Sequence, residues 1–110
     1  MPKAQRGEVW QIDFGLAAKV RPALVYSVPF VENERALYAV IPHTTAVRGT
    51  RFEIALRLSG LEQGVFDVQN LGAISQARLM RKVVVLIPGA DKEDVPIGSV
   101  IRVSEKLRSV

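Results

Sequence analysis

The feature that most constrains the fold is a series of short apolar segments that recur about every ten residues. Residues 8–14 (EVWQIDF) and 51–57 (RFEIALR) alternate apolar and polar side chains, which is typical of strands buried on one face. Residues 22–28 (PALVYSV) and 36–42 (ALYAVIP) are apolar on both faces, which predicts central strands. Pro22 fits such a strand because we expect it to begin the strand.

Two further segments, residues 64–69 (GVFDVQ) and 78–87 (RLMRKVVVLI), are predicted strands, and the connections between segments are short and polar. Evenly spaced strands with turns between them favour a mainly β protein, a small antiparallel barrel, in one domain over residues 1–110. Only the C-terminal region changes period. From residue 97 onward apolar side chains recur at three- and four-residue intervals, which predicts a C-terminal amphipathic α-helix.

The composition excludes several classes of function. With no cysteine and a single histidine, the chain cannot build the usual zinc sites, and the lack of cysteine fits a reducing cytoplasm. Neither glycine-rich phosphate-binding motif occurs, and no apolar run is long enough to span a membrane. The formal net charge of +4 points weakly to a polyanionic partner. An enzyme of this composition is expected to work without metal or cofactor.

Four stretches place polar side chains where a predicted strand meets a loop: residues 19–22 (KVRP), 42–45 (PHTT), 67–70 (DVQN) and 75–78 (SQAR). With their surroundings (RGEVWQIDFG, VRPALVYS, VIPHTT with RGTRFEI, and GVFDVQNLGAISQARL) they resemble the MazF/PemK toxin family in order and spacing, over about residues 6–82. The resemblance implies an SH3-like barrel with a C-terminal helix that acts as a homodimer. It also implies a metal-independent, sequence-specific endoribonuclease of single-stranded mRNA, held inactive by a cognate antitoxin.

Carried over by motif, the resemblance makes Arg21 and Thr45 the catalytic candidates. Metal-free RNA cleavage uses the neighbouring 2′-hydroxyl as nucleophile and leaves a 2′,3′-cyclic phosphate and a 5′-hydroxyl. The Arg21 guanidinium suits the charge that grows on the phosphate, and Thr45 is expected to orient the phosphate or the 2′-hydroxyl. The alternative role of Arg21 is that of a rim arginine paired with Asp13 or Glu53. The alternative role of Thr45 is to form a turn. His43 is a further candidate acid or base, or else a structural histidine.

The remaining RNA contacts are expected from cations that neutralise phosphates and from two amides that read bases or hold the backbone: Lys19, Arg48, Arg51, Gln69, Asn70, Arg78, Arg81 and Lys82. The chain departs from the family at Val68, where many relatives carry an aspartate. Asp67 lies one position earlier, and neighbouring residues of a strand face opposite sides. We therefore expect Asp67 not to replace the missing carboxylate.

Two other functions stay open. One is a non-catalytic toxin on the same scaffold, like the CcdB gyrase poisons, although the end of this chain (KLRSV) lacks the aromatic residue expected there. The other is a degenerate member that binds RNA or antitoxin without cleavage. The expected partners are single-stranded RNA, an antitoxin and a second copy of the chain, with no membrane.

Overall fold

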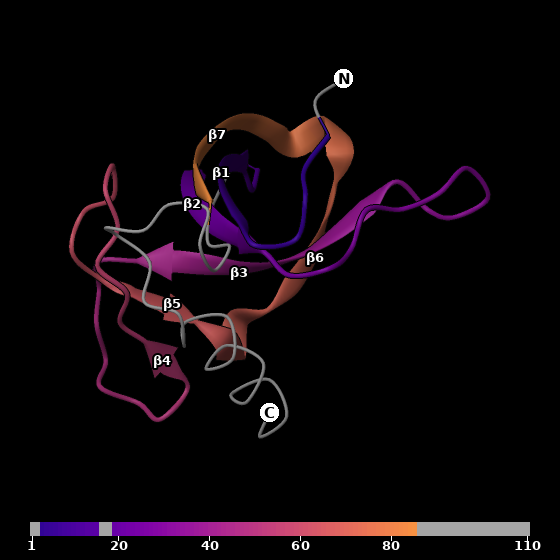
Figure 1. Ribbon diagram of the computed structural model, residues 1–110. Helices are drawn as coiled ribbons and strands as arrows, with labels where there is room; N and C mark the ends of the chain where they lie inside the picture. Colours follow the sequence, from indigo (N-terminus) through magenta and orange to yellow (C-terminus); the bar gives the residue numbers. More distant parts are fainter. Residues whose placement is uncertain (1–2, 16–18, 86–110) are drawn as a thin grey trace.

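The computed structural model describes residues 3–15 and 19–85, which form one antiparallel sheet of seven strands (Figure 1). The elements are β1 (Glu8–Asp13), β2 (Val20–Val25), β3 (Leu37–Thr44), β4 (Glu53–Ile54), β5 (Val65–Asp67), η1 (Val68–Asn70), β6 (Gly72–Ser75), η2 (Gln76–Arg78) and β7 (Leu79–Val85), where η marks a 3₁₀ turn. The strand order is β4-β5-β3-β2-β1-β7, and β6 pairs with β3 outside this path. The predicted mainly β, antiparallel architecture is confirmed. Over the described residues, the sheet is not closed into a complete barrel. The predicted C-terminal helix lies outside the described residues.

Two apolar clusters lie on opposite faces of the central strands. On β2, Leu24 belongs to one cluster, while Ala23 and Val25 belong to the other, as strand alternation requires. The same division holds on β3, so the prediction that these two strands are apolar on both faces is confirmed. On β1 the prediction of one buried face was incomplete, because Val9 is as fully buried as Ile12 and packs in the opposite cluster.

Two strands are shorter than predicted, and one strand was not predicted. Of residues 51–57, only Glu53 and Ile54 form a strand, although Ile54 and Leu56 are buried as the alternation predicts. Strand β4 pairs with β5, predicted over residues 64–69, which is only three residues long because the chain turns into η1 after Asp67. Strand β6 was not predicted, since its short sequence GAIS carries no clear apolar pattern.

Pro22 is the third residue of β2, not the first as predicted, because the strand begins at Val20. The Phe14 N–H donates to the Lys19 carbonyl over 2.9 Å, which makes this a hydrogen-bonded pair of the β1–β2 hairpin. Such pairs alternate with non-hydrogen-bonded ones, and the register then places Pro22 opposite Gln11 in a non-hydrogen-bonded pair. The missing N–H of the proline therefore removes no bond to β1.

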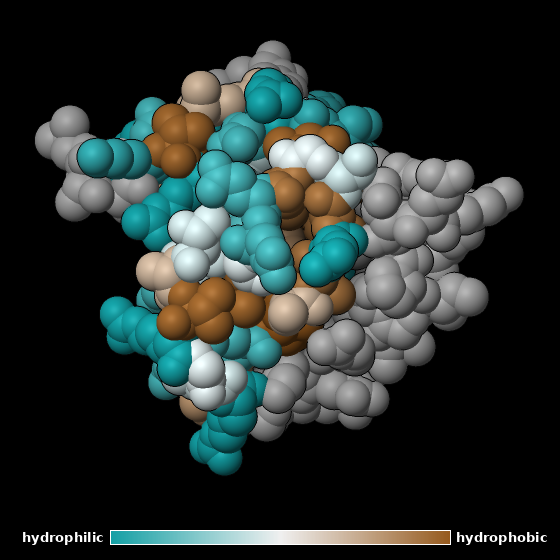
Figure 2. Space-filling model, turned by 90° about the vertical axis from the view of Figure 1, so that its left-hand side faces the viewer, coloured by the Kyte–Doolittle hydropathy of each residue, from teal (hydrophilic) through white to brown (hydrophobic). Residues whose placement is uncertain are grey.

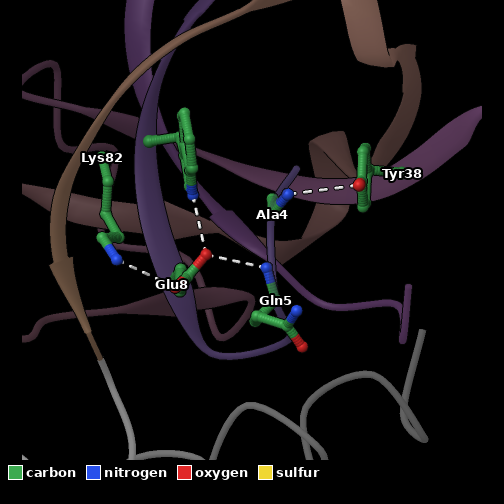
Figure 3. Close-up of polar contacts among 6 residues, drawn as sticks. Ala4, Gln5, Glu8, Tyr38 and Lys82 are labelled. Carbon is green, nitrogen blue, oxygen red and sulfur yellow. Dashed lines mark hydrogen bonds and ion pairs between the residues drawn. The ribbon is translucent and has the colours of Figure 1, made fainter. Parts of the chain in front are cut away.

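A buried carboxylate ties the N-terminal segment to β1 and β7 (Figure 3). One oxygen of Glu8 accepts from the Gln5 N–H at 2.7 Å and from the Trp10 Nε1–H at 3.0 Å. The other oxygen lies 3.4 Å from the Lys82 Nζ. In the part of the chain described here, no helix has the length and apolar character needed to cross a membrane.

Candidate functional site

Two adjoining hollows lie where the start of β2 meets the end of β3. The first, the His43 pocket, has a volume of about 510 Å³, and the second, the Gln69 pocket, about 450 Å³. Arg21, Thr44 and Ala46 line both, so the two hollows share a wall there. Figure 2 faces the end of the molecule toward which β3 points, and shows hydrophilic side chains around a hollow that has apolar residues inside it.

Arg21 stands on this shared wall. It is exposed near the start of β2, in register with Ile12 of β1, and the next residues of its strand, from Ala23 on, are buried. The two carboxylates named as its alternative partners have other contacts. Asp13 lies 3.7 Å from the Arg78 guanidinium, and Glu53 accepts backbone N–H groups of the following loop. Arg21 itself lines both hollows.

Thr45 lines the His43 pocket together with Arg21 and His43, so the structure brings the three catalytic candidates into one hollow. Thr45 is exposed. A local turn is formed by its neighbour, since the Thr44 hydroxyl accepts the Ala46 N–H at 3.0 Å.

His43 lies on β3 and is only 3% exposed. Its ring meets the Phe66 ring edge-on, with 5.0 Å between centroids. Its Nε2 is buried and has no hydrogen-bond partner among the described residues. Burial lowers the pKa of His43 below its ordinary value, and the nearby negative charge of Glu62 partly opposes this shift. The ring is therefore neutral at pH 7.

Asp67 was expected not to replace the family's carboxylate, because neighbouring strand residues face opposite sides. The structure nevertheless places it in the lining of the Gln69 pocket with Arg21, while Val68 is fully buried in the core. The two residues do face opposite sides: Val68 faces the core, and Asp67 faces the hollow. Asp67 also accepts from the Gln69 N–H at 3.2 Å and from the Asn70 side-chain amide at 3.3 Å. It thereby caps η1 and fixes the Asn70 side-chain amide beside the hollow.

Arg48 enters the Gln69 pocket from a loop that Glu53 holds in place. The Glu53 carboxylate accepts the N–H groups of Arg48 at 3.0 Å, Gly49 at 2.7 Å and Thr50 at 3.2 Å. These bonds, first that from the Arg48 N–H, lower the pKa of Glu53. Gly49 has a φ of +77°, a conformation that favours glycine, so the tight turn under the carboxylate depends on it.

The other predicted RNA-binding cations line neither hollow: Lys19, Arg51, Arg78, Arg81 and Lys82. Arg78 and Lys82 are paired with Asp13 and Glu8. Arg51 lies over the Phe52 ring, 4.8 Å from its centroid. Arg81 lines a further hollow whose other walls include residues shared with the His43 pocket.

Sequence reasoning did not select Gln11 or Glu62, which also line the His43 pocket. Gln11 could have been found on the polar face of residues 8–14, opposite Pro22 in the hairpin. Glu62 lies in a loop without a pattern, and no signal in the sequence singles it out. Within residues 3–15 and 19–85, no group of three or more His, Cys, Asp or Glu is placed to hold a metal ion.

Comparison with known proteins gives a match to the family described as PemK-like, MazF-like toxin of type II toxin–antitoxin system over residues 5–105. A MazE–MazF structure from Deinococcus radiodurans is similar with a TM-score of 0.74 at 21% identity, over 99% of this chain and 95% of that one. The Mycobacterium tuberculosis toxin MazF-mt6 has a TM-score of 0.70 at 23% identity, over 93% of each chain. A mycobacterial endoribonuclease in complex with its cognate antitoxin has a TM-score of 0.72 at 18% identity, over 96% of this chain and 92% of that one. No curated protein matches the chain.

Proposed function

The chain belongs to the PemK-like, MazF-like toxin family of type II toxin–antitoxin systems, and from this membership we propose that it is a metal-independent endoribonuclease that cleaves single-stranded RNA. The observation that carries the proposal is the position of Arg21 on the wall between two hollows. A single strand laid across this wall would set one phosphate at Arg21 and one nucleotide in each hollow. Single-stranded RNA suits such a site because its bases can be splayed apart and recognised separately.

In the proposed reaction the 2′-oxygen attacks the adjacent phosphorus, and the bond from phosphorus to the 5′-oxygen breaks. The products are a 2′,3′-cyclic phosphate and a 5′-hydroxyl. Arg21 donates to the phosphate oxygens as their negative charge grows, and Thr45 orients the phosphate from the same hollow. The proton of the 2′-hydroxyl must go to a base, and Asp67, which lines the Gln69 pocket beside Arg21, is the carboxylate we assign to it. The departing 5′-oxygen takes up a proton from water or from Arg21.

The third candidate, His43, is better suited to the wall of its pocket than to proton transfer. Its Nε2 is fully buried, and a general acid or base must reach the proton that it moves. The outer cations, Lys19 and Arg81, remain our proposed contacts to more distant phosphates, since both are exposed.

We propose a cognate antitoxin and a second copy of the chain as the protein partners, in the cytoplasm. The antitoxin proposal is supported by family membership and by solved relatives that are complexes with their antitoxins. The exposed apolar side chains of Val20 and Met80, which line the hollow next to the His43 pocket, offer such a partner an apolar contact beside the site. The gyrase-poison alternative rests on the C-terminal end of the chain, which lies outside the described residues.

The test is incubation of the purified chain with a long RNA of mixed sequence in excess EDTA, followed by mapping of the cut ends. We expect 2′,3′-cyclic phosphate and 5′-hydroxyl ends, and a rate about 10²–10³-fold lower for Arg21→Ala. Arg35→Ala is the matched control, because Arg35 is exposed and lines neither hollow. Full activity in Arg21→Ala would overturn its assignment. Intact RNA together with loss of DNA supercoiling would favour the gyrase-poison alternative, and RNA binding without cleavage would favour the degenerate toxin.

A further inference from the structure

The His43 pocket contains two groups that the proposed cleavage chemistry leaves unused. Glu62, on the loop between β4 and β5, is exposed and lines the hollow. His43 is buried in its wall, and the Nε2 of this ring has no partner among the described residues. Folded proteins rarely leave a buried polar atom without a hydrogen bond, so this nitrogen is an unusual feature of the pocket wall, while the group that faces a ligand in the hollow is the exposed Glu62.

The contents of the pocket limit which ligand it can take. A carboxylate such as Glu62 only accepts hydrogen bonds, and a neutral imidazole offers one donor and one acceptor. Gln11, in the same hollow, offers both kinds of group. The hollow of about 510 Å³ is within the range of small-molecule sites, and Arg21 at its edge would hold the phosphate of whatever nucleotide entered.

Resting on the proposed ribonuclease function, we propose that the His43 pocket is a guanine-binding subsite next to the cleaved phosphate, with Glu62 as its specificity-determining residue. Guanine presents two neighbouring N–H donors on its Watson–Crick edge, N1–H and the 2-amino group, and the two oxygens of one carboxylate can accept both. Adenine and cytosine place an acceptor nitrogen beside their amino group, and uracil offers one N–H between two carbonyls. Each of these bases would therefore set a lone pair against the Glu62 carboxylate, which is unfavourable.

The first experiment maps cut sites in a long mixed-sequence RNA for the unmodified chain, for Glu62→Gln and for Glu32→Gln. Glu32→Gln makes the same change at an exposed position that lines neither hollow. We expect guanine at one fixed position beside the cut in the unmodified chain and in Glu32→Gln. In Glu62→Gln we expect continued cleavage with that preference lost, because the amide keeps only one acceptor. A preference that persists in Glu62→Gln would overturn the proposal.

The second experiment does not depend on cleavage, because nucleoside 5′-monophosphates contain no internucleotide bond. We expect GMP to bind at least about tenfold more tightly than AMP, CMP or UMP, as befits charge-assisted hydrogen bonds, and Glu62→Gln to remove this difference. His43 is the only histidine of the chain, so its ring resonances can be followed by NMR without ambiguity. They should shift with GMP and not with UMP.

The combined outcomes separate the two proposals. Cleavage without a guanine preference, with equal binding of the four monophosphates, overturns the subsite and leaves the ribonuclease. Preferential binding of GMP that depends on Glu62, without cleavage of any RNA, supports the pocket and overturns the ribonuclease. Equal binding without any cleavage overturns both.

Discussion

Substitution of Gly64 by alanine tests whether the end of β3 is held in the position that the site requires. Gly64 is buried just before β5, opposite the end of β3. A Cβ at this residue would meet the Thr44 carbonyl oxygen well inside contact distance, and the Cε1 of His43 at 2.9 Å. The φ of Gly64 is not in the left-handed region, so the clash alone decides the outcome. A backbone carbonyl cannot swing aside, and the strand end and the ring must therefore both move.

The size of the effect follows from overpacking, which typically costs about 1–3 kcal/mol in a well-packed interior. The matched control is Gly72→Ala, where the nearest atom, the Asn70 carbonyl oxygen, would lie at an ordinary 3.9 Å. There the lower entropy of the unfolded chain should give no loss, or a gain of about 0.4–1 kcal/mol. For a chain of this size the destabilised variant should melt roughly 4–20 °C lower than the unmodified protein.

Urea unfolding followed by circular dichroism measures both variants, and the ring resonances of His43 report whether the pocket wall has moved. If the proposed function holds, RNA cleavage by Gly64→Ala should fall about 10²-fold at a temperature where it is still folded, since displacements of about 1 Å at a site have this effect. An unfolding free energy within about 0.5 kcal/mol of the unmodified chain, with unshifted His43 resonances, would refute the reasoning.

Two further predictions concern buried groups. Glu8→Ala leaves the buried Trp10 Nε1–H without its acceptor and should lower the free energy of unfolding by about 2–4 kcal/mol. Lys82→Met removes a half-exposed lysine from the buried Glu8 carboxylate, which keeps its bonds from Gln5 and Trp10, and should cost less than about 1 kcal/mol. Equal losses in urea titrations would contradict this ranking. Because burial lowers the pKa of His43 in the folded chain, the unfolded chain binds the proton first as the pH falls below 6.5, and stability should decrease from there down to the lowered pKa. His43→Gln should remove this part of the pH dependence, and a variant that kept it would show that another group is responsible.

The central part of the fold could be predicted because β2 and β3 bury both faces, and only a central strand requires apolar side chains at every position. The short edge elements could not be predicted in the same way. Residues 51–57 alternate correctly, yet the length of β4 is set by its partner β5, which ends where η1 begins. A local pattern records which side chains are buried, but not how far the neighbouring strand extends.

The site was predictable to the extent that its residues follow strand ends. Arg21, His43 and Thr45 meet because β2 and β3 are antiparallel neighbours, so the start of one lies beside the end of the other. The position of Asp67 in the groove does not follow from the family pattern, which has an aspartate at the position of Val68. The polarity of the two residues was the better guide: an apolar Val68 is drawn into the core, and the aspartate before it is left facing the groove.

The distribution of charge in the two hollows bears on how RNA would be held there. Among the described residues that line them, the cations are Arg21 and Arg48, and the carboxylates are Glu53, Glu62 and Asp67. A lining of this kind cannot hold a polyanion by charge neutralisation alone, although the chain as a whole is basic. Carboxylates repel phosphates but accept hydrogen bonds from bases, so they weaken non-specific binding while favouring particular nucleotides. Glu53 holds the loop of Arg48 and Asp67 is our proposed base, so under the proposed function Glu62 is the carboxylate left to select the nucleotide.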